Sequence, residues 1–168
     1  QEKGIFYQQK DGVLTVRGTL KPGIYSLPGD VSSQFITGLL FALPPLDGNS
    51  EIVLTTPLES RGYVDLTLDV LRTFGIRVEE RADAFHVPGS QHYESRDFTV
   101  EADWSQAAFW YAANFAGGQL DIQGLNMDSK QGDKVIALQY WQLAKPGEAE
   151  LDVSQCPDLV PPLAAMAA

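Results

Sequence analysis

Apolar residues recur at helical spacing in several stretches of the chain. In the first stretch they are three or four positions apart, and they are Phe35, Ile36, Leu39, Leu40 and Leu43. This spacing predicts a helix over 35–43, which Pro44-Pro45 ends. The same pattern predicts further helices over 63–74, 104–115 and 133–143. These helices are apolar over more than half of their surface, so we expect sheets to cover them.

Short runs rich in strand-forming residues lie between these helices. In the first half of the chain they predict strands over 4–9, 13–17, 25–27, 51–56, 76–80 and 84–87. In the second half they predict strands over 98–101, 119–123 and 148–153. The order strand, helix, strand, helix, strand, strand therefore returns in a shortened form. We predict an α/β (α+β) fold of repeated βαβαββ units; chance similarity between two α/β pieces is the alternative.

The polar residues just before the first predicted helix are suited to binding an anion. Ser32, Ser33 and Gln34 occupy the place where a helix start exposes unpaired backbone N–H groups and the positive end of its dipole. This predicts a phosphate-binding turn, with a simple helix cap as the alternative. The segment returns as Asp103-Trp-Ser105-Gln106, which we interpret as a capping motif only.

Composition and charge narrow the classes of protein. The net charge of −10 and the absence of a basic stripe exclude a nucleic-acid-binding surface. Cys156 is the single cysteine, which excludes an internal disulfide and fits a reducing compartment. The two histidines lack neighbouring cysteines, so we predict no metal site. No apolar run reaches the length of a membrane span, and no leader is evident.

The two ends suggest that this chain is a piece of a longer one. It begins at Gln1 rather than at Met, and it stops at Ala168, where a predicted helix has barely begun. A third repeat unit is expected to start at Asp158.

A series of ordered blocks resembles one enzyme family. Pro28–Phe35, Ser60–Tyr63 with Thr67, Phe74-Gly75, Val100–Ser105, Gly117-Gly118 and Cys156–Asp158 are similar to successive blocks of the 5-enolpyruvylshikimate-3-phosphate (EPSP) synthases. The resemblance implies an inside-out α/β barrel fold of two similar domains with the active site in the cleft. It implies that residues 1–97 are the last βαβαββ unit of one domain, with the strands preceding it. Residues 98–168 would then be the first unit of the other domain and the start of the next.

The resemblance also implies an activity. Members of the family transfer the enolpyruvyl group of phosphoenolpyruvate to the 5-hydroxyl of shikimate 3-phosphate and release phosphate, in the shikimate pathway to aromatic amino acids. They need no metal or organic cofactor. The expected partners are therefore these two small molecules, and the expected location is the cytoplasm, with the parent protein a monomer.

Particular residues match the family's substrate contacts. Ser32, Ser33 and Gln34 match positions that hold shikimate 3-phosphate, and Gln34 also matches a residue that reaches toward phosphoenolpyruvate. Ser60 matches a second hydroxyl that binds the substrate phosphate. Its alternative role is to cap the helix that follows.

The resemblance assigns chemistry to two further residues. Tyr63 matches an aromatic residue near the shikimate ring, where a core residue at a helix start is the alternative. Asp158 matches the proton acceptor that contacts the shikimate moiety, where an ordinary N-cap aspartate is the alternative. The family usually has a proline where this chain has Gly62, so the loop geometry is expected to differ here.

The resemblance places the family's substrate-clamping lysines and arginines outside Gln1–Ala168. We therefore expect the chain alone to be inactive and to self-associate through exposed apolar helix faces. Two alternatives remain. One is a related transferase acting on UDP-N-acetylglucosamine, and the other is a non-catalytic anion-binding module on the same fold.

Overall fold

The computed structural model describes residues 3–168 and divides into two compact units. Unit 1 comprises the residues up to Leu58 together with Thr67–Arg96, and unit 2 comprises Glu59–Leu66 and Asp97–Ala168. The division falls inside helix α2 (Arg61–Thr73), whose first residues are grouped with unit 2.

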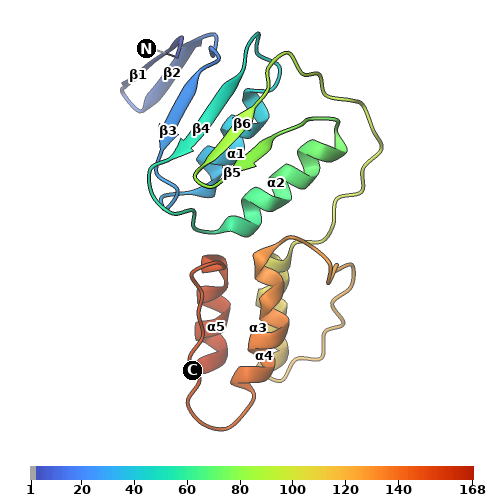
Figure 1. Ribbon diagram of the computed structural model, residues 1–168. Coiled ribbons are helices and arrows are strands. Elements are labelled where there is room, and N and C mark those ends of the chain that lie inside the picture. Colours follow the sequence, from blue (N-terminus) through green and yellow to red (C-terminus); the bar gives the residue numbers. More distant parts are fainter. Residues whose placement is uncertain (1–2) are drawn as a thin grey trace. The chain divides into compact units, whose positions relative to one another are not determined.

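Unit 1 is built on strands. An antiparallel hairpin of β1 (Ile5–Lys10) and β2 (Val13–Gly18) precedes a sheet with the order β3-β4-β6-β5. In this sheet β3 (Ile24–Leu27) pairs in parallel with β4 (Ser50–Leu54). The antiparallel neighbours β6 (Ala84–Val87) and β5 (Glu79–Arg81) complete it. Figure 1 shows the sheet with its strands side by side.

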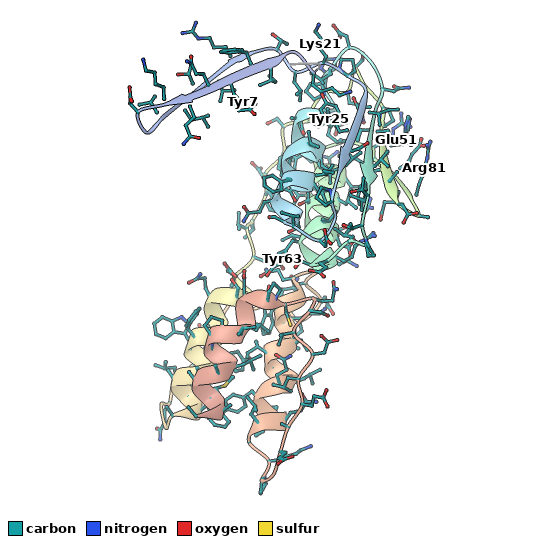
Figure 2. The ribbon with its side chains drawn as sticks, turned by 90° about the vertical axis from the view of Figure 1, so that its left-hand side faces the viewer. Tyr7, Lys21, Tyr25, Glu51, Tyr63 and Arg81 are labelled. Carbon is teal, nitrogen blue, oxygen red and sulfur yellow. The ribbon has the colours of Figure 1, made fainter. Side chains whose placement is uncertain are left out.

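Helices cover one face of this sheet. The segment of α2 in unit 1 and helix α1 (Ser33–Ala42) lie on the same side of the strands in both views (Figures 1 and 2). Their apolar faces supply much of the core of the unit, which includes Ile36, Leu40, Ile52, Leu71, Phe85 and Val87. The order β3-α1-β4-α2-β5-β6 confirms the βαβαββ unit that the first half of the sequence predicted.

The end of α2 follows the expected local chemistry. Gly75 has φ +81, a left-handed conformation that suits glycine. Its N–H donates to the Arg72 carbonyl, and the Ile76 N–H donates to the Leu71 carbonyl. This is the Schellman arrangement, so Gly75 terminates the helix.

Unit 2 is helical. Its elements are α3 (Trp104–Phe115), a 3-10 turn η1 (Gly132–Val135) that continues into α4 (Ile136–Leu143), and a second such turn η2 (Pro157–Leu159) that continues into α5 (Val160–Ala167). The three α-helices lie side by side (Figure 1). They share one buried cluster of Trp104, Ala108, Ile136, Cys156, Leu159, Leu163 and Met166.

The strands predicted over 98–101, 119–123 and 148–153 are wrong. Within unit 2 these segments form no β-ladder. Apolar alternation does place Leu151 and Val153 against the helical core. A strand also requires a partner for its backbone N–H and C=O groups, and the described residues of this unit provide none. Across residues 3–168, no helix is long and apolar enough to cross a membrane.

Candidate functional site

The turn before α1 has a shape fixed by the segment that follows β4. Gly29 donates its N–H to the Thr56 hydroxyl at 2.9 Å, and that hydroxyl donates to Asp30 Oδ1 at 2.7 Å. A side chain at position 29 would lie 2.8 Å from the Thr56 carbonyl oxygen, so glycine is needed for this close approach. The turn thereby delivers Ser32 to the N-terminus of α1.

The hydroxyl of Ser32 acts as the N-cap of α1. It accepts a hydrogen bond from the Gln34 N–H at 3.3 Å. Ser33 is partly buried and Gln34 is exposed, and among residues 3–168 neither side chain has a hydrogen-bond partner. Because the Ser32 bond is long, this turn retains donors that a ligand could use.

The corresponding turn before α3 is committed to capping. Asp103 Oδ1 accepts from the N–H groups of Ser105 and Gln106, at 2.8 and 3.2 Å. The Ser105 hydroxyl also donates to Asp103, at 2.7 Å. The interpretation of this segment as a capping motif is therefore confirmed. Two similar sequences at helix starts differ in whether their hydroxyls are already occupied.

Ser60 lies directly before α2 in an unusual backbone conformation. Its φ of +53 is in the left-handed region, which costs a non-glycine residue about 1–2 kcal/mol. Its carbonyl oxygen accepts the Tyr63 N–H at 3.2 Å. Strain of this kind collects at functional sites, which makes Ser60 a candidate ligand residue.

Tyr63 and Asp158 lie together in unit 2. The Tyr63 hydroxyl, on α2, is 3.2 Å from Asp158 Oδ2 in the first turn of η2. It is also 2.7 Å from Asp133 Oδ2 in η1. Figure 2 labels Tyr63 near the start of α2. Cys156 is the N-cap residue of η2, so Asp158 is not the N-cap aspartate of the alternative reading.

Asp133 is the residue that the sequence did not reveal. Its side chain is 1% exposed, and its Oδ1 atom has no hydrogen-bond partner in residues 3–168. Burial raises the pKa of Asp133, the hydrogen bond from Tyr63 lowers it, and the charge of Asp158 raises it; the net shift is upward. Burial also raises the pKa of Tyr63 well above its ordinary value, and the bond to Asp133 adds to this effect.

Backbone packing holds η1 against the start of α2. A side chain at Gly62 would lie 3.0 Å from both the Gly132 nitrogen and the Lys130 carbonyl oxygen. The glycine that departs from the family pattern therefore lets the chain before Asp133 approach Tyr63 closely.

A polar network fixes the loop that leads to η1. Glu101 accepts hydrogen bonds from the Ser129 hydroxyl at 2.6 Å and from the Gln131 and Asn126 amides at 3.1 Å. Burial alone would raise the pKa of Glu101, but these bonds together lower it. Gln131 Oε1 in turn accepts the Trp104 N–H at 2.8 Å, which ties the loop to α3.

The predicted site residues fall into both units. Ser32, Ser33 and Gln34 belong to unit 1, whereas Ser60, Tyr63 and Asp158 belong to unit 2. Within unit 2 the structure brings Tyr63 and Asp158 into contact and adds Asp133 to them. In residues 3–168 no group of three or more His, Cys, Asp or Glu side chains could hold a metal ion.

Comparison with known proteins identifies the family of this chain. The family model described as EPSP synthase (3-phosphoshikimate 1-carboxyvinyltransferase) matches residues 4–168. The chain belongs to the EPSP synthase family. Its relatives include the 3-phosphoshikimate 1-carboxyvinyltransferases of Clostridium acetobutylicum, 45% identical, and Clostridium beijerinckii, 43% identical. Each match covers 99% of this chain and 43% of the relative, so the chain spans less than half of their length.

A solved structure of an EPSP synthase supports the fold. The chain matches the enzyme from Acinetobacter baumannii with a TM-score of 0.50 and 24% identity, over 66% of this chain and 25% of that one. The α/β class predicted from the sequence is therefore confirmed.

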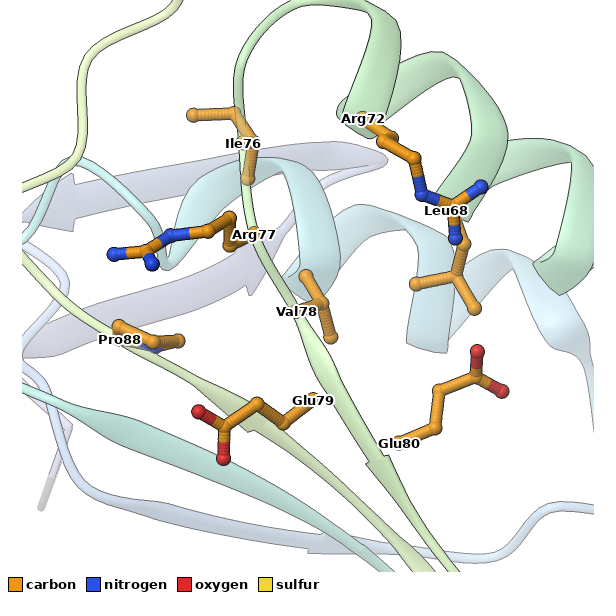
Figure 3. Close-up of a pocket in the computed structure, with 8 residues that line it drawn as sticks. All are labelled: Leu68, Arg72, Ile76, Arg77, Val78, Glu79, Glu80 and Pro88. Carbon is orange, nitrogen blue, oxygen red and sulfur yellow. The ribbon is translucent and has the colours of Figure 1, made fainter.

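A cavity of about 280 Å³ in unit 1 is separate from the residues expected of an EPSP synthase site. It lies between α2 and β5 (Figure 3). Its lining consists of Leu68, Arg72, Ile76, Arg77, Val78, Glu79, Glu80 and Pro88. Glu79 and Glu80 offset its two arginines, and Arg72 is bonded to Asp69 at 2.7 Å. The charges do not favour an anionic substrate there.

Proposed function

We propose that this chain forms the shikimate 3-phosphate side of an EPSP synthase active site, with Asp158 as the proton acceptor. The contact between Tyr63 and Asp158 carries the proposal. It joins an aromatic residue and an exposed carboxylate, from elements 95 positions apart, that match the family's substrate contacts. An exposed carboxylate at this place can reach a substrate hydroxyl and take its proton as the C–O bond forms.

In this proposal neutral donors bind the substrate phosphate. Ser32, Ser33 and Gln34 hold it at the N-terminus of α1, where backbone N–H groups and the helix dipole favour an anion. Ser60 supplies a further hydroxyl. Hydrogen bonds to charged groups are worth about 1.5–3 kcal/mol each, so a few of them suffice for binding despite the acidic net charge.

The remaining assignments follow from the same function. Residues 1–97 would hold the last βαβαββ unit of one domain, and residues 98–168 the first unit of the other. Phosphoenolpyruvate is the second substrate, with Gln34 toward it, and the reaction takes place in the cytoplasm. The chain by itself does not turn over and self-associates, because the cationic groups of the family's site and the sister units are not among its residues.

Titration of the chain with shikimate 3-phosphate, followed by NMR, tests the proposal. We expect saturable shifts at Ser32, Ser33, Gln34 and Ser60, and their loss in a Ser33→Ala variant. Ser105→Ala is the matched control, because its hydroxyl is already bonded to Asp103; it should leave the titration unchanged. UDP-N-acetylglucosamine should produce no such shifts.

Other results would contradict this function. Shifts confined to other residues, or equal responses to both ligands, would exclude the shikimate 3-phosphate site. Enolpyruvyl transfer by the isolated chain would show that its residues alone complete the catalytic site.

A further inference from the structure

The Tyr63 hydroxyl faces two carboxylates but has a single hydrogen to donate. Its oxygen is 2.7 Å from Asp133 Oδ2 and 3.2 Å from Asp158 Oδ2. All three residues belong to unit 2. Because a phenol carries one O–H, it can donate fully to one of these oxygens only.

Burial decides which carboxylate receives this hydrogen. Asp133 is 1% exposed, and its Oδ1 atom already lacks a hydrogen-bond partner within the described residues 3–168. Leaving Oδ2 without a donor as well would add the cost of another buried unpaired group. Asp158 is exposed, so water can solvate it. The shorter distance and the burial both direct the Tyr63 hydrogen to Asp133.

We propose that Asp133 is a positioning residue for Asp158, acting through Tyr63. With its hydrogen committed to Asp133, the Tyr63 oxygen presents a lone pair to Asp158 Oδ2. A protonated Asp158 can then donate its hydrogen to Tyr63 across the 3.2 Å contact. The inference rests on the proposed function, in which Asp158 takes the proton of the acceptor hydroxyl.

The proton transfer is a single balanced step. The O–H bond of the substrate hydroxyl breaks, and a new O–H bond forms on Asp158 Oδ2. The electron pair of the broken O–H bond stays on the substrate oxygen, and Asp158 carries the proton. Tyr63 keeps its own hydrogen and Asp133 takes no proton, so both orient the product of the transfer rather than accept it.

The surrounding structure holds Asp133 in place for this task. The close backbone packing of Gly62 against Gly132 seats η1 beside the start of α2. Gln131 is bonded to Trp104 and to Glu101, which fixes the residues just before Asp133. The charged or titratable side chains that face Asp133 are Tyr63, Asp158, Asp103 and Cys156.

The direction of the Tyr63 hydrogen can be observed in this chain by NMR. We expect a hydrogen-bonded phenolic proton that is absent in Tyr63→Phe, retained in Asp158→Asn, and lost or shifted in Asp133→Asn. Asp158→Asn is the folding control, because Asp158 is exposed. A proton that persists in Asp133→Asn and vanishes in Asp158→Asn would show that Tyr63 donates to Asp158, and would overturn the proposal.

Turnover supplies the functional test, in a full-length enzyme of the family that carries this sequence. Tyr63→Phe and Asp133→Asn should each lower kcat by about tenfold or more, with little change in KM. This loss is a part of the rate enhancement of about 10²–10⁴-fold that a general base contributes. The double variant should be no slower than either single one, because the residues act as a unit. Additive losses, or an unchanged kcat in Asp133→Asn, would overturn the proposal.

Turnover by Asp158→Asn separates the positioning role of Asp133 from the proposed function of Asp158. If Asp158→Asn abolishes turnover while the other variants remain fast, only the positioning role is wrong. If Asp158→Asn leaves kcat unchanged, the proposed function itself is wrong.

Discussion

At the scale of single residues, the candidate site combines two features that stability alone would disfavour. Ser60 holds a left-handed backbone conformation, and Asp133 is a buried carboxylate with one oxygen that has no hydrogen-bond partner in the described part of the chain. Each lies next to a residue expected to contact the substrate. Substitutions at Ser60 and Asp133 can therefore change the stability of the chain and its binding of ligand by different amounts.

Replacing Ser60 by glycine should stabilise the chain while weakening ligand binding. Glycine adopts φ +53 without strain, so Ser60→Gly is expected to raise the free energy of unfolding by about 1 kcal/mol. Ser60→Ala keeps the strain and should give no such gain. Both variants lose the hydroxyl and should bind shikimate 3-phosphate about tenfold more weakly, as measured by calorimetry. Equal stabilities in urea unfolding of the two variants would contradict this explanation.

Asp133 should make the stability of unit 2 depend on pH. Burial is the main cause that raises the pKa of Asp133 above 3.8. The contribution of this group to the free energy of unfolding is therefore fully present below pH 3.8. The contribution is lost as the pH rises through the raised pKa. Urea unfolding of the unmodified chain and of Asp133→Asn, at a series of pH values, measures the difference.

The comparison between these two proteins isolates one carboxyl group. We expect the unmodified chain to lose stability relative to Asp133→Asn as the pH rises from 3.8 through the raised pKa of Asp133. A difference that stays constant, or that changes in the opposite direction, would mean that Asp133 is not protonated more readily in the folded state.

At the scale of elements, α1 and α3 begin with similar sequences but differ in how their first N–H groups are satisfied. Ser32 caps α1 with one long bond, and the hydroxyl of Ser33 remains available. At α3 the Asp103 carboxylate accepts hydrogen bonds from the backbone N–H groups of Ser105 and Gln106 and from the Ser105 hydroxyl. Helix α3 is therefore capped by its own sequence, whereas α1 retains the side-chain donors that the proposed function assigns to an anion.

Removal of the α3 cap should destabilise unit 2. Asp103→Ala leaves the N–H groups of Ser105 and Gln106 without a side-chain partner, and we expect it to lower the free energy of unfolding by about 1 kcal/mol. Asp128→Ala is the matched control, because it removes the same charge from an exposed position. That control should change stability by less than about 0.5 kcal/mol in urea unfolding. Similar losses in both variants would assign the effect to charge rather than to capping.

At the scale of the whole molecule, the chain spans 43% of the relatives in the comparison and leaves large apolar side chains exposed. In unit 2 they include Phe109 and Trp110 on α3, and Leu138 and Trp141 on α4. The last two are each 68% exposed. Exposed apolar groups of this size favour association.

Self-association of the isolated chain should depend on this face of α4. Light scattering is expected to show oligomers for the unmodified chain and a shift toward monomer for the double variant Leu138→Glu with Trp141→Glu. Gln142→Glu, at a neighbouring exposed position, adds a negative charge without removing apolar surface and should leave the oligomers unchanged. A compact monomer for the unmodified chain would contradict the prediction.

The sequence by itself determined the features that depend on neighbours along the chain. The helices of both halves and the polar turn before α1 were all predicted, because helix spacing and capping involve residues a few positions apart. The ordered family blocks also indicated Tyr63 and Asp158.

Only the tertiary structure decided the features that require distant partners. The predicted strands of unit 2 are absent because a strand needs another strand for its backbone groups, and apolar alternation does not supply one. Folding brings Asp133 and Asp158 to the hydroxyl of Tyr63, although they lie 70 and 95 residues after it in the sequence. Neither the burial of a carboxylate nor the choice of which acceptor receives a single hydrogen can be derived from local sequence, since both depend on packing between elements.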